Sequence, residues 1–313
     1  MNYRVLGRTG LKVSCISLGT VELGVDYGIR KPAEPNRPGR DEAVNLLRYA
    51  ADNGVNLFDT APGYGISEEL LGIAIGPRSD CYIATKVSIP VTADKYSSAT
   101  NLKSIVHLSL DSSLRALHRD VIDIVQIHNA TTEVMNRREV TEALLNAKQS
   151  GKVRFIGVSV YGEESAMTAI QLGCFDVIQV AYNLLDQRMA QTVFPHARES
   201  NIGIISRSAL LKGVLTERAR WLPEELAELR MASERIIDAY GVSWDSLPLL
   251  ALRFCISSDF VHSVLIGVSN RQELDMAIAA AKNGLLDDEK MKSAAIFAMN
   301  DETLLNPSFW PIP

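Results

Sequence analysis

The stretch VNLFDTAPGYG, residues 55–65, begins as a short apolar strand and ends in a turn that contains one proline and two glycines. An acid, Asp59, ends the apolar run, and Tyr64 follows it in the turn. A phenol is a weak acid, with a reference pKa of about 10, and a nearby cation favours its ionised form. A lysine at the end of another strand could supply this cation to Tyr64.

Two further apolar runs end in ionisable residues. CYIATK, residues 81–86, ends in Lys86, and DIVQIH, residues 123–128, ends in His128. Apolar, β-branched runs of this kind recur along the whole chain and predict strands. They cover residues 13–19, 55–59, 81–86, 122–128, 153–159, 177–182, 202–206 and 264–267.

Longer amphipathic segments separate these runs and predict helices, which include residues 41–53, 102–117, 140–150, 163–172 and 271–282. Near-continuous apolar strands that alternate with helices are typical of a parallel sheet covered on its faces. Eight such units predict an α/β fold, a (β/α)8 TIM barrel. No linker interrupts it, so we expect a single domain over residues 1–313, with an N-terminal hairpin in residues 3–14 and an additional C-terminal helix over residues 287–299.

Active sites of such barrels lie at the carboxyl ends of the strands. The predicted strand ends carry Gly19, Thr20, Asp59, Lys86, His128, Ser159, Asn183, Ser206, Arg207 and Gly267. Ionisable residues therefore end three of the first four strands. In isolation, Asp59 and Lys86 could equally be a structural ion pair, Tyr64 a rim aromatic and His128 a brace for its loop.

Composition and charge exclude several classes of function. The net charge of the 313-residue chain is −5, whereas nucleic-acid-binding proteins usually carry a basic surface. The four cysteines have no metal-ligand spacing, so we expect buried thiols in a reducing compartment and no metal site. The first residues lack the apolar core of a signal peptide, and no run reaches the roughly 18 apolar residues of a membrane helix. We expect a cytoplasmic protein with a small-molecule substrate and no membrane or nucleic-acid partner.

The segment over residues 22–40 is a long loop that follows the first predicted strand, on the active-site rim. It contains three prolines and several basic residues. Loops longer than about 12 residues are often functional or disordered. Both a lid over the site and a solvated insertion fit this sequence.

With these residues identified, the sequence resembles the aldo-keto reductases over nearly its full length. The matching segments stand in register, in the order RVLGRTGLKVS (4–14), LGT (18–20), FDTAPGYG (58–65), SEELLG (67–72), ATK (84–86), DVIDIVQIH (120–128), GKVRFIGVS (151–159), QVAYN (179–183) and LIGVS (265–269). They are most similar to the branch that contains sugar dehydrogenases and potassium-channel β-subunit-like proteins.

The resemblance implies hydride transfer between a nicotinamide cofactor and a carbonyl or alcohol, such as an aldehyde, a ketone or a sugar. Tyr64 would give the proton to the carbonyl oxygen, or take it from the alcohol. Lys86 would lower the pKa of Tyr64, and Asp59 would hold Lys86. His128 would orient the substrate oxygen.

The resemblance also implies a cofactor site. Ser159 and Gln179 match residues that bind the carboxamide, and the backbone near Ser208 matches the loop on the pyrophosphate. The full predicted set is Gly19, Thr20, Ser159, Gln179, Arg207, Ser208, Leu210, Lys212, Gly213, Gly267, Ser269, Arg271 and Glu273.

Two positions depart from the family pattern. Arg207 stands where relatives have Tyr or Trp against the nicotinamide; it could stack there, reach an anionic or hydroxyl-rich substrate, or point to solvent. Glu273 would disfavour a ribose 2′-phosphate, whereas Arg271 would favour one. The family favours NADP, and NAD stays open.

Two other functions remain possible on the same barrel. A lyase would use Lys86 as a Schiff base, which requires a neutral lysine. A nicotinamide-binding redox sensor would keep the same four residues and act on a partner protein. The substrate, the direction of the reaction and the oligomeric state are left open by the sequence.

Overall fold

The computed structural model describes residues 1–29, 37–90 and 99–312, with the backbone alone for residues 99–101. Its parallel strands form a closed barrel in the order β10-β3-β4-β5-β6-β7-β8-β9, which confirms the predicted (β/α)8 fold. The strands are β3 (Ile16–Gly19), β4 (Leu57–Asp59), β5 (Tyr82–Ser88), β6 (Ile122–His128), β7 (Val153–Ser159), β8 (Val177–Ala181), β9 (Gly203–Arg207) and β10 (Ser263–Gly267).

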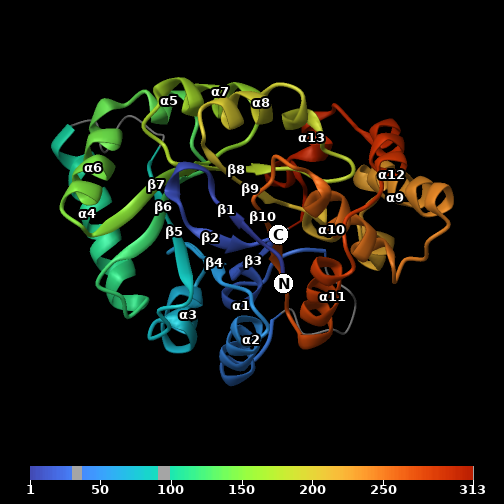
Figure 1. Cartoon of the computed structure of the whole chain (residues 1–313), viewed down its shortest axis with the longest axis horizontal. Helices are drawn as coiled ribbons and strands as arrows, with labels where there is room; N and C mark the ends of the chain where they lie inside the picture. The colour runs from blue at the N-terminus through green and yellow to red at the C-terminus, as the bar shows by residue number, and fades with distance from the viewer. Residues whose placement is uncertain (30–36, 91–98, 313) are drawn as a thin grey trace.

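The helices surround this barrel (Figure 1). They are α1 (Val21–Gly24), α2 (Arg40–Asp52), α3 (Ser67–Ile75), α4 (Ala99–Ala116), α5 (Thr132–Met135), α6 (Arg138–Gln149), α7 (Glu163–Leu172), α8 (Val193–Glu199), α9 (Ala227–Tyr240), α10 (Leu247–Ser257), α11 (Arg271–Lys282), α12 (Asp288–Ser293) and α13 (Glu302–Leu305). Their apolar faces pack on the outside of the strands and form the main core. None of the helices in the described segments is long and apolar enough to cross a membrane.

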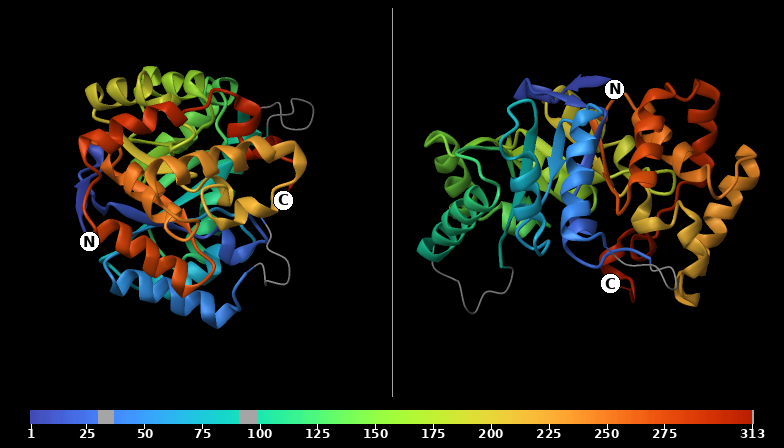
Figure 2. Two further views of the ribbon diagram at one scale, coloured as in Figure 1. Left: turned by 90° about the vertical axis from the view of Figure 1, so that its right-hand side faces the viewer. Right: turned by 90° about the horizontal axis from the view of Figure 1, so that it is seen from below.

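A hairpin closes the amino-terminal end of the barrel. Strands β1 (Tyr3–Val5) and β2 (Lys12–Ser14) pair antiparallel, which confirms the predicted N-terminal hairpin. Leu6, Leu11 and Val13 pack against inward side chains such as Leu57 and Ile124. Figure 2 shows the hairpin and the C-terminus at opposite ends of the barrel. Because one end is sealed by apolar contacts, ligands must approach from the other.

Most predicted bounds differ from the structure by a few residues, and two predicted elements differ by more than that. The run over residues 13–19 divides at Cys15 into the end of the hairpin and the barrel strand β3. The Cys15 backbone bonds to Asn2 on one side and to Val264 on the other, which marks the crossing from one sheet to the next. The predicted C-terminal helix is shorter: α12 ends at Ser293 and continues as a 3₁₀ turn over Ala294–Phe297.

Helix α3 is the clearest element that we did not predict. It follows the Tyr64 turn directly and is mostly buried on all sides, so it lacks the polar face that marks a surface helix. All four cysteines are free thiols, and Cys15, Cys81 and Cys255 are buried, whereas Cys174 is partly exposed.

Candidate active site

Strand alternation aims the functional side chains at the barrel interior. Residues two apart on a strand share a face. Five residues of the barrel strands lie in the apolar cluster inside the barrel, so the residues two positions after them also point inward. The interior residues are Leu57, Ala84, Ile124, Val177 and Ile205. The polar residues that follow them on the same face are Asp59, Lys86, Gln126, Gln179 and Arg207, and His128 comes two positions after Gln126. The open end of the barrel is therefore lined with polar groups.

Asp59 and Lys86 form a buried ion pair. The two residues are 2% and 1% exposed, and Lys86 Nζ donates to Asp59 Oδ1. The same ammonium donates to the Thr60 carbonyl oxygen at 3.0 Å. A buried charge is costly unless it is paired and hydrogen-bonded, and this lysine satisfies both conditions.

The second oxygen of Asp59 is held by two amides. Gln126 Nε2 donates to Asp59 Oδ2 at 3.0 Å, and Gln179 Nε2 donates to the same atom at 2.9 Å. The sequence analysis gave Gln179 a cofactor role and did not identify Gln126. Gln126 lies two residues before His128, on the same inward face of the strand, but within the apolar run and not at its end, so the sequence did not mark it.

Tyr64 completes the group from the loop after β4. Its hydroxyl lies 3.4 Å from His128 Nε2, and the two rings meet edge to face with centroids 5.6 Å apart. Lys86 Nζ lies 4.9 Å from the centre of the Tyr64 ring. The structure thus brings Asp59, Tyr64, Lys86 and His128 together; we call this group the tetrad.

The electrostatics of the tetrad differ from our expectation in one respect. Burial raises the pKa of Tyr64 above its ordinary value, and the field of Lys86 opposes this shift without outweighing it. Lys86 thus lowers the pKa of Tyr64 as predicted, but burial, which the sequence did not reveal, outweighs this effect. Burial tends to lower the pKa of Lys86, but attraction to Asp59 and hydrogen bonding outweigh it and raise the pKa. Burial, with Lys86 nearby, lowers the pKa of His128 to about 4, so the imidazole is neutral at pH 7.

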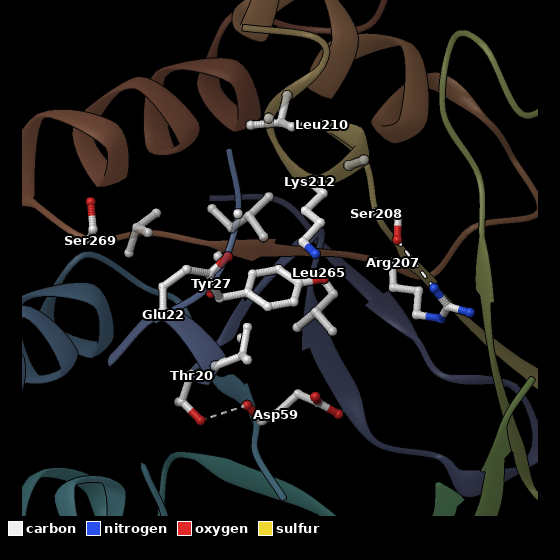
Figure 3. A pocket seen from close by; sticks show the side chains of 18 of the residues that line it. Thr20, Glu22, Tyr27, Asp59, Arg207, Ser208, Leu210, Lys212, Leu265 and Ser269 are labelled. Carbon is white, nitrogen blue, oxygen red and sulfur yellow. Dashed lines mark hydrogen bonds between the residues drawn. The ribbon is translucent and has the colours of Figure 1, made fainter. Parts of the chain in front are cut away.

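A cavity of about 290 Å³ opens above the tetrad. Its lining includes Tyr64, His128 and all but one of the predicted cofactor residues, namely Gly19, Thr20, Ser159, Gln179, Arg207, Ser208, Leu210, Lys212, Gly213, Gly267, Ser269 and Glu273. Figure 3 shows Arg207 and Ser269 at opposite sides of this cavity. We call the two regions the tetrad end and the Glu273 end.

The backbone turn after β9 has a conformation that can bind an anionic group. Ser208, Leu211 and Lys212 have positive φ angles of 56°, 45° and 54°, which non-glycine residues rarely adopt. Successive N–H groups in such turns form concave anion sites, and strain of this kind concentrates at functional sites. Asn183 supports the turn, since its Nδ2 donates to the Ser208 carbonyl oxygen at 3.0 Å. Lys212 adds a cation whose pKa is lowered by burial.

The Glu273 end is acidic and partly exposed. Glu273 Oε2 accepts from the Ser269 backbone N–H at 2.7 Å and from Ser269 Oγ at 3.1 Å, and Arg218 Nη2 lies 3.4 Å from Oε1. Arg271 lies outside the cavity: it is exposed, 3.7 Å from Asp275, with its guanidinium over the Tyr49 ring. The structure therefore separates Arg271 from the other predicted cofactor residues.

Two cavity residues, Glu22 and Tyr27, were missed as individual sites because they lie in the segment over residues 22–40 that gave no motif. Both side chains point into the cavity, with Tyr27 beside Lys212, whose Nζ is 4.9 Å from the ring centre (Figure 3). Burial, with repulsion from Glu273, raises the pKa of Glu22 to about 7. The first part of the segment thus covers the cavity, as a lid would. Residues 30–36 lie outside the described part of the chain.

The family model for aldo/keto reductases matches residues 15–297. The chain belongs to the aldo-keto reductase family. It is 32% identical over 295 residues to the L-galactose dehydrogenase of Arabidopsis thaliana, covering 90% of this chain and 88% of that one. It is 28% identical over 317 residues to the L-glyceraldehyde 3-phosphate reductase of Escherichia coli, with coverages of 90% and 88%.

Solved aldo-keto reductase structures share the fold. The holo form of an aldo-keto reductase from Bacillus halodurans superposes with a TM-score of 0.77 at 26% identity, covering 96% of this chain and 97% of that one. As an aldo-keto reductase, the protein is an oxidoreductase that uses a nicotinamide cofactor and acts on small-molecule carbonyl or sugar substrates.

Proposed function

We propose that this aldo-keto reductase interconverts a hydroxyl-rich carbonyl compound, such as a sugar, and the corresponding alcohol, with Tyr64 as the general acid and base. The observation that carries the proposal is the convergence of Tyr64, Lys86 and His128 at the floor of one cavity. A nicotinamide bound there would supply or accept the hydride.

The chain's own residues manage the proton. In reduction, the Tyr64 hydroxyl gives its proton to the carbonyl oxygen; in oxidation, its phenolate takes the proton from the alcohol. The Lys86 ammonium stabilises the phenolate, and Asp59 fixes that ammonium with the help of Gln126. Neutral His128 holds the substrate oxygen within reach of the Tyr64 hydroxyl.

A sugar is the substrate class that the cavity and the relatives favour. The relatives named above are an L-galactose dehydrogenase and an L-glyceraldehyde 3-phosphate reductase, whose names give a sugar and a sugar phosphate as their substrates. Around the tetrad, the cavity wall carries the polar side chains of Asn129, Tyr161 and Arg207. Several hydrogen-bonding groups are what a hydroxyl-rich ligand requires, because each unpaired buried hydroxyl costs binding free energy.

We further propose that the cofactor is NAD in preference to NADP. The family resemblance favoured NADP, and Arg271 was the residue that supported it. Arg271 faces Asp275 and Tyr49 outside the cavity, whereas the Glu273 carboxylate lies within it and already takes the Ser269 donors. A 2′-phosphate at this end would meet like charge and occupied donors.

The ion pair weighs against the lyase alternative. A Schiff-base lysine must be neutral to attack a carbonyl. Attraction to Asp59 raises the pKa of Lys86, so its amine stays protonated and its lone pair is not available.

A steady-state screen tests the proposal. Purified protein is offered L- and D-sugars, sugar phosphates and simple aldehydes with each cofactor, and turnover is followed at the absorbance of the reduced nicotinamide. We expect sustained turnover on at least one sugar and a higher kcat/KM with NAD than with NADP. A single oxidation of bound cofactor without sustained turnover on any compound would favour the redox sensor instead.

A further inference from the structure

Arg207 is held in one orientation at the tetrad end. It is the last residue of β9, and its guanidinium carbon lies 3.8 Å from the centre of the Tyr161 ring. Nη2 donates to the Val160 carbonyl oxygen at 3.0 Å, and Nη1 donates to Ser208 Oγ at 3.2 Å. These contacts fix a planar cation against one wall of the cavity (Figure 3).

None of the residues that the structure describes neutralises this cation. Among the described residues, no carboxylate lies within ion-pair distance of Arg207, and its buried Nε has no hydrogen-bond partner. The other charges at the tetrad end cancel, because Lys86 is paired with Asp59 and His128 is neutral. The tetrad end therefore carries an excess of positive charge, and Arg207 is its source.

The positive charge of Arg207 acts on the reacting groups. Its field lowers the pKa of Tyr64 and the pKa of His128, although burial has the larger effect on each of them. By the family resemblance, the position of Arg207 is the one that faces the nicotinamide, where relatives carry a neutral Tyr or Trp. A fixed cation thus replaces a neutral ring beside the hydride-transfer step.

We propose that Arg207 sets the redox balance of the site: it disfavours the oxidised, cationic nicotinamide relative to the reduced, neutral one, and so biases the enzyme toward alcohol oxidation. This inference rests on the proposed function. In the oxidation, the C–H bond of the carbinol breaks and its electron pair leaves with the hydride to the oxidised nicotinamide. The hydroxyl proton passes to the Tyr64 phenolate, and the products are the carbonyl compound, the reduced nicotinamide and the Tyr64 phenol.

Arg207 assists both halves of that step. Like charges repel more strongly in a partly buried site than in water, so a fixed cation beside a cationic ring disfavours that ring. The same positive charge stabilises the Tyr64 phenolate, which is the base that the oxidation requires. Removing the charge should weaken the bias without removing any member of the tetrad.

Binding measurements test this directly. The dissociation constants of oxidised and reduced cofactor are measured by calorimetry and by nicotinamide fluorescence for the wild type, Arg207→Gln and Arg207→Lys. In the wild type we expect the reduced form to bind more tightly. In Arg207→Gln the ratio of the oxidised to the reduced Kd should fall about tenfold, which is about 30 mV for a two-electron couple. Arg207→Lys keeps the charge and should stay near the wild-type ratio.

Lys212→Met is the matched control. Lys212 is a cation of the same cavity, on the strained turn near the Tyr27 ring rather than beside the tetrad. We expect Lys212→Met to weaken both cofactor forms by the same factor and to leave their ratio unchanged. A second readout is the pH dependence of alcohol oxidation, whose rise should move to higher pH in Arg207→Gln as the pKa of Tyr64 increases further.

The outcomes separate this inference from the proposed function. If Arg207→Gln weakens or strengthens both forms equally, Arg207 is only a binding residue and the redox proposal is wrong. If neither form binds the wild type, the proposed function fails and this inference fails with it. Arg207→Tyr, the side chain of the relatives, replaces Arg207→Gln if the latter does not fold, as judged by circular dichroism, and the same tenfold fall is expected.

Discussion

The two ends of the cavity are built in opposite ways. At the tetrad end, the charged side chains come from strands, Asp59 and Lys86 are almost fully buried, and each polar atom of the Asp59 carboxylate has a partner. At the Glu273 end, Glu22 comes from the short helix α1, Arg218 from a 3₁₀ turn and Glu273 from the first turn of α11, and all three residues are partly exposed. Strand ends fix a geometry that chemistry requires, whereas the segments that connect the strands to the outer helices supply charges that select a ligand.

The free-energy cost of a substitution should also differ between the two ends of the cavity. At the tetrad end, removing one partner leaves a charge without water or a counter-ion, which is expensive. At the Glu273 end, solvent reaches the pair formed by Arg218 and Glu273, so a substitution in this pair changes affinity more than stability. The predictions below test this difference, beginning with the largest effect.

Tyr64→Phe should lower kcat by about 10²- to 10⁴-fold, because it removes only the hydroxyl that transfers the proton. The half-buried ring and its edge-to-face contact with His128 remain possible. We therefore expect the unfolding transition and the cofactor Kd to stay near wild type, as measured by circular dichroism and fluorescence titration. A kcat near that of the wild type would remove Tyr64 from the proton-transfer role.

Lys86→Met should lower the free energy of unfolding by about 3–5 kcal/mol, because it leaves the buried Asp59 carboxylate without its positive partner. The matched control is Lys103→Met, which breaks the ion pair with Glu142 where the two side chains are 39% and 36% exposed. That change should cost less than about 1 kcal/mol. Urea unfolding of both variants measures the difference; equal costs would show that the tetrad pair is as well solvated as the surface pair.

The pH dependence should differ between the two directions of the reaction. Because burial raises the pKa of Tyr64, its phenol stays protonated through the neutral range. Carbonyl reduction uses the protonated form and should hold its rate from neutral to mildly alkaline pH. Alcohol oxidation uses the phenolate and should rise by about tenfold per pH unit over the same range. Rates measured in both directions from pH 6 to 10 would contradict this if the oxidation were flat.

Glu273→Gln should shift the preference toward NADP by about tenfold in kcat/KM, by removing a negative charge from the end that would hold a 2′-phosphate. Asp275→Asn is the control on the same helix, because Asp275 faces Arg271 outside the cavity. We expect no change in preference there. A preference for NADP in the wild type, unaltered by Glu273→Gln, would show that the phosphate lies elsewhere.

The fold and the tetrad were accessible from the sequence for the same reason. Parallel barrel strands are buried on both faces, so each one reads as an apolar run, and the first polar residue at its end marks the rim. This is why residues 122–128 and 153–159 were predicted with the bounds that β6 and β7 have. Gln126 was missed because an amide within an apolar run has no distinctive spacing.

The sequence by itself determined the barrel, the order of its strands along the chain, and the chemical types of Asp59, Tyr64, Lys86 and His128. Only the tertiary structure decided the balance of charges between them: that burial outweighs Lys86 in setting the pKa of Tyr64, that Arg271 leaves the cavity while Glu273 stays, and that no carboxylate of the described segments pairs with Arg207. Periodicity is a local property of the chain, whereas desolvation and Coulomb energy depend on distances between residues far apart in sequence, which are fixed only when the barrel closes.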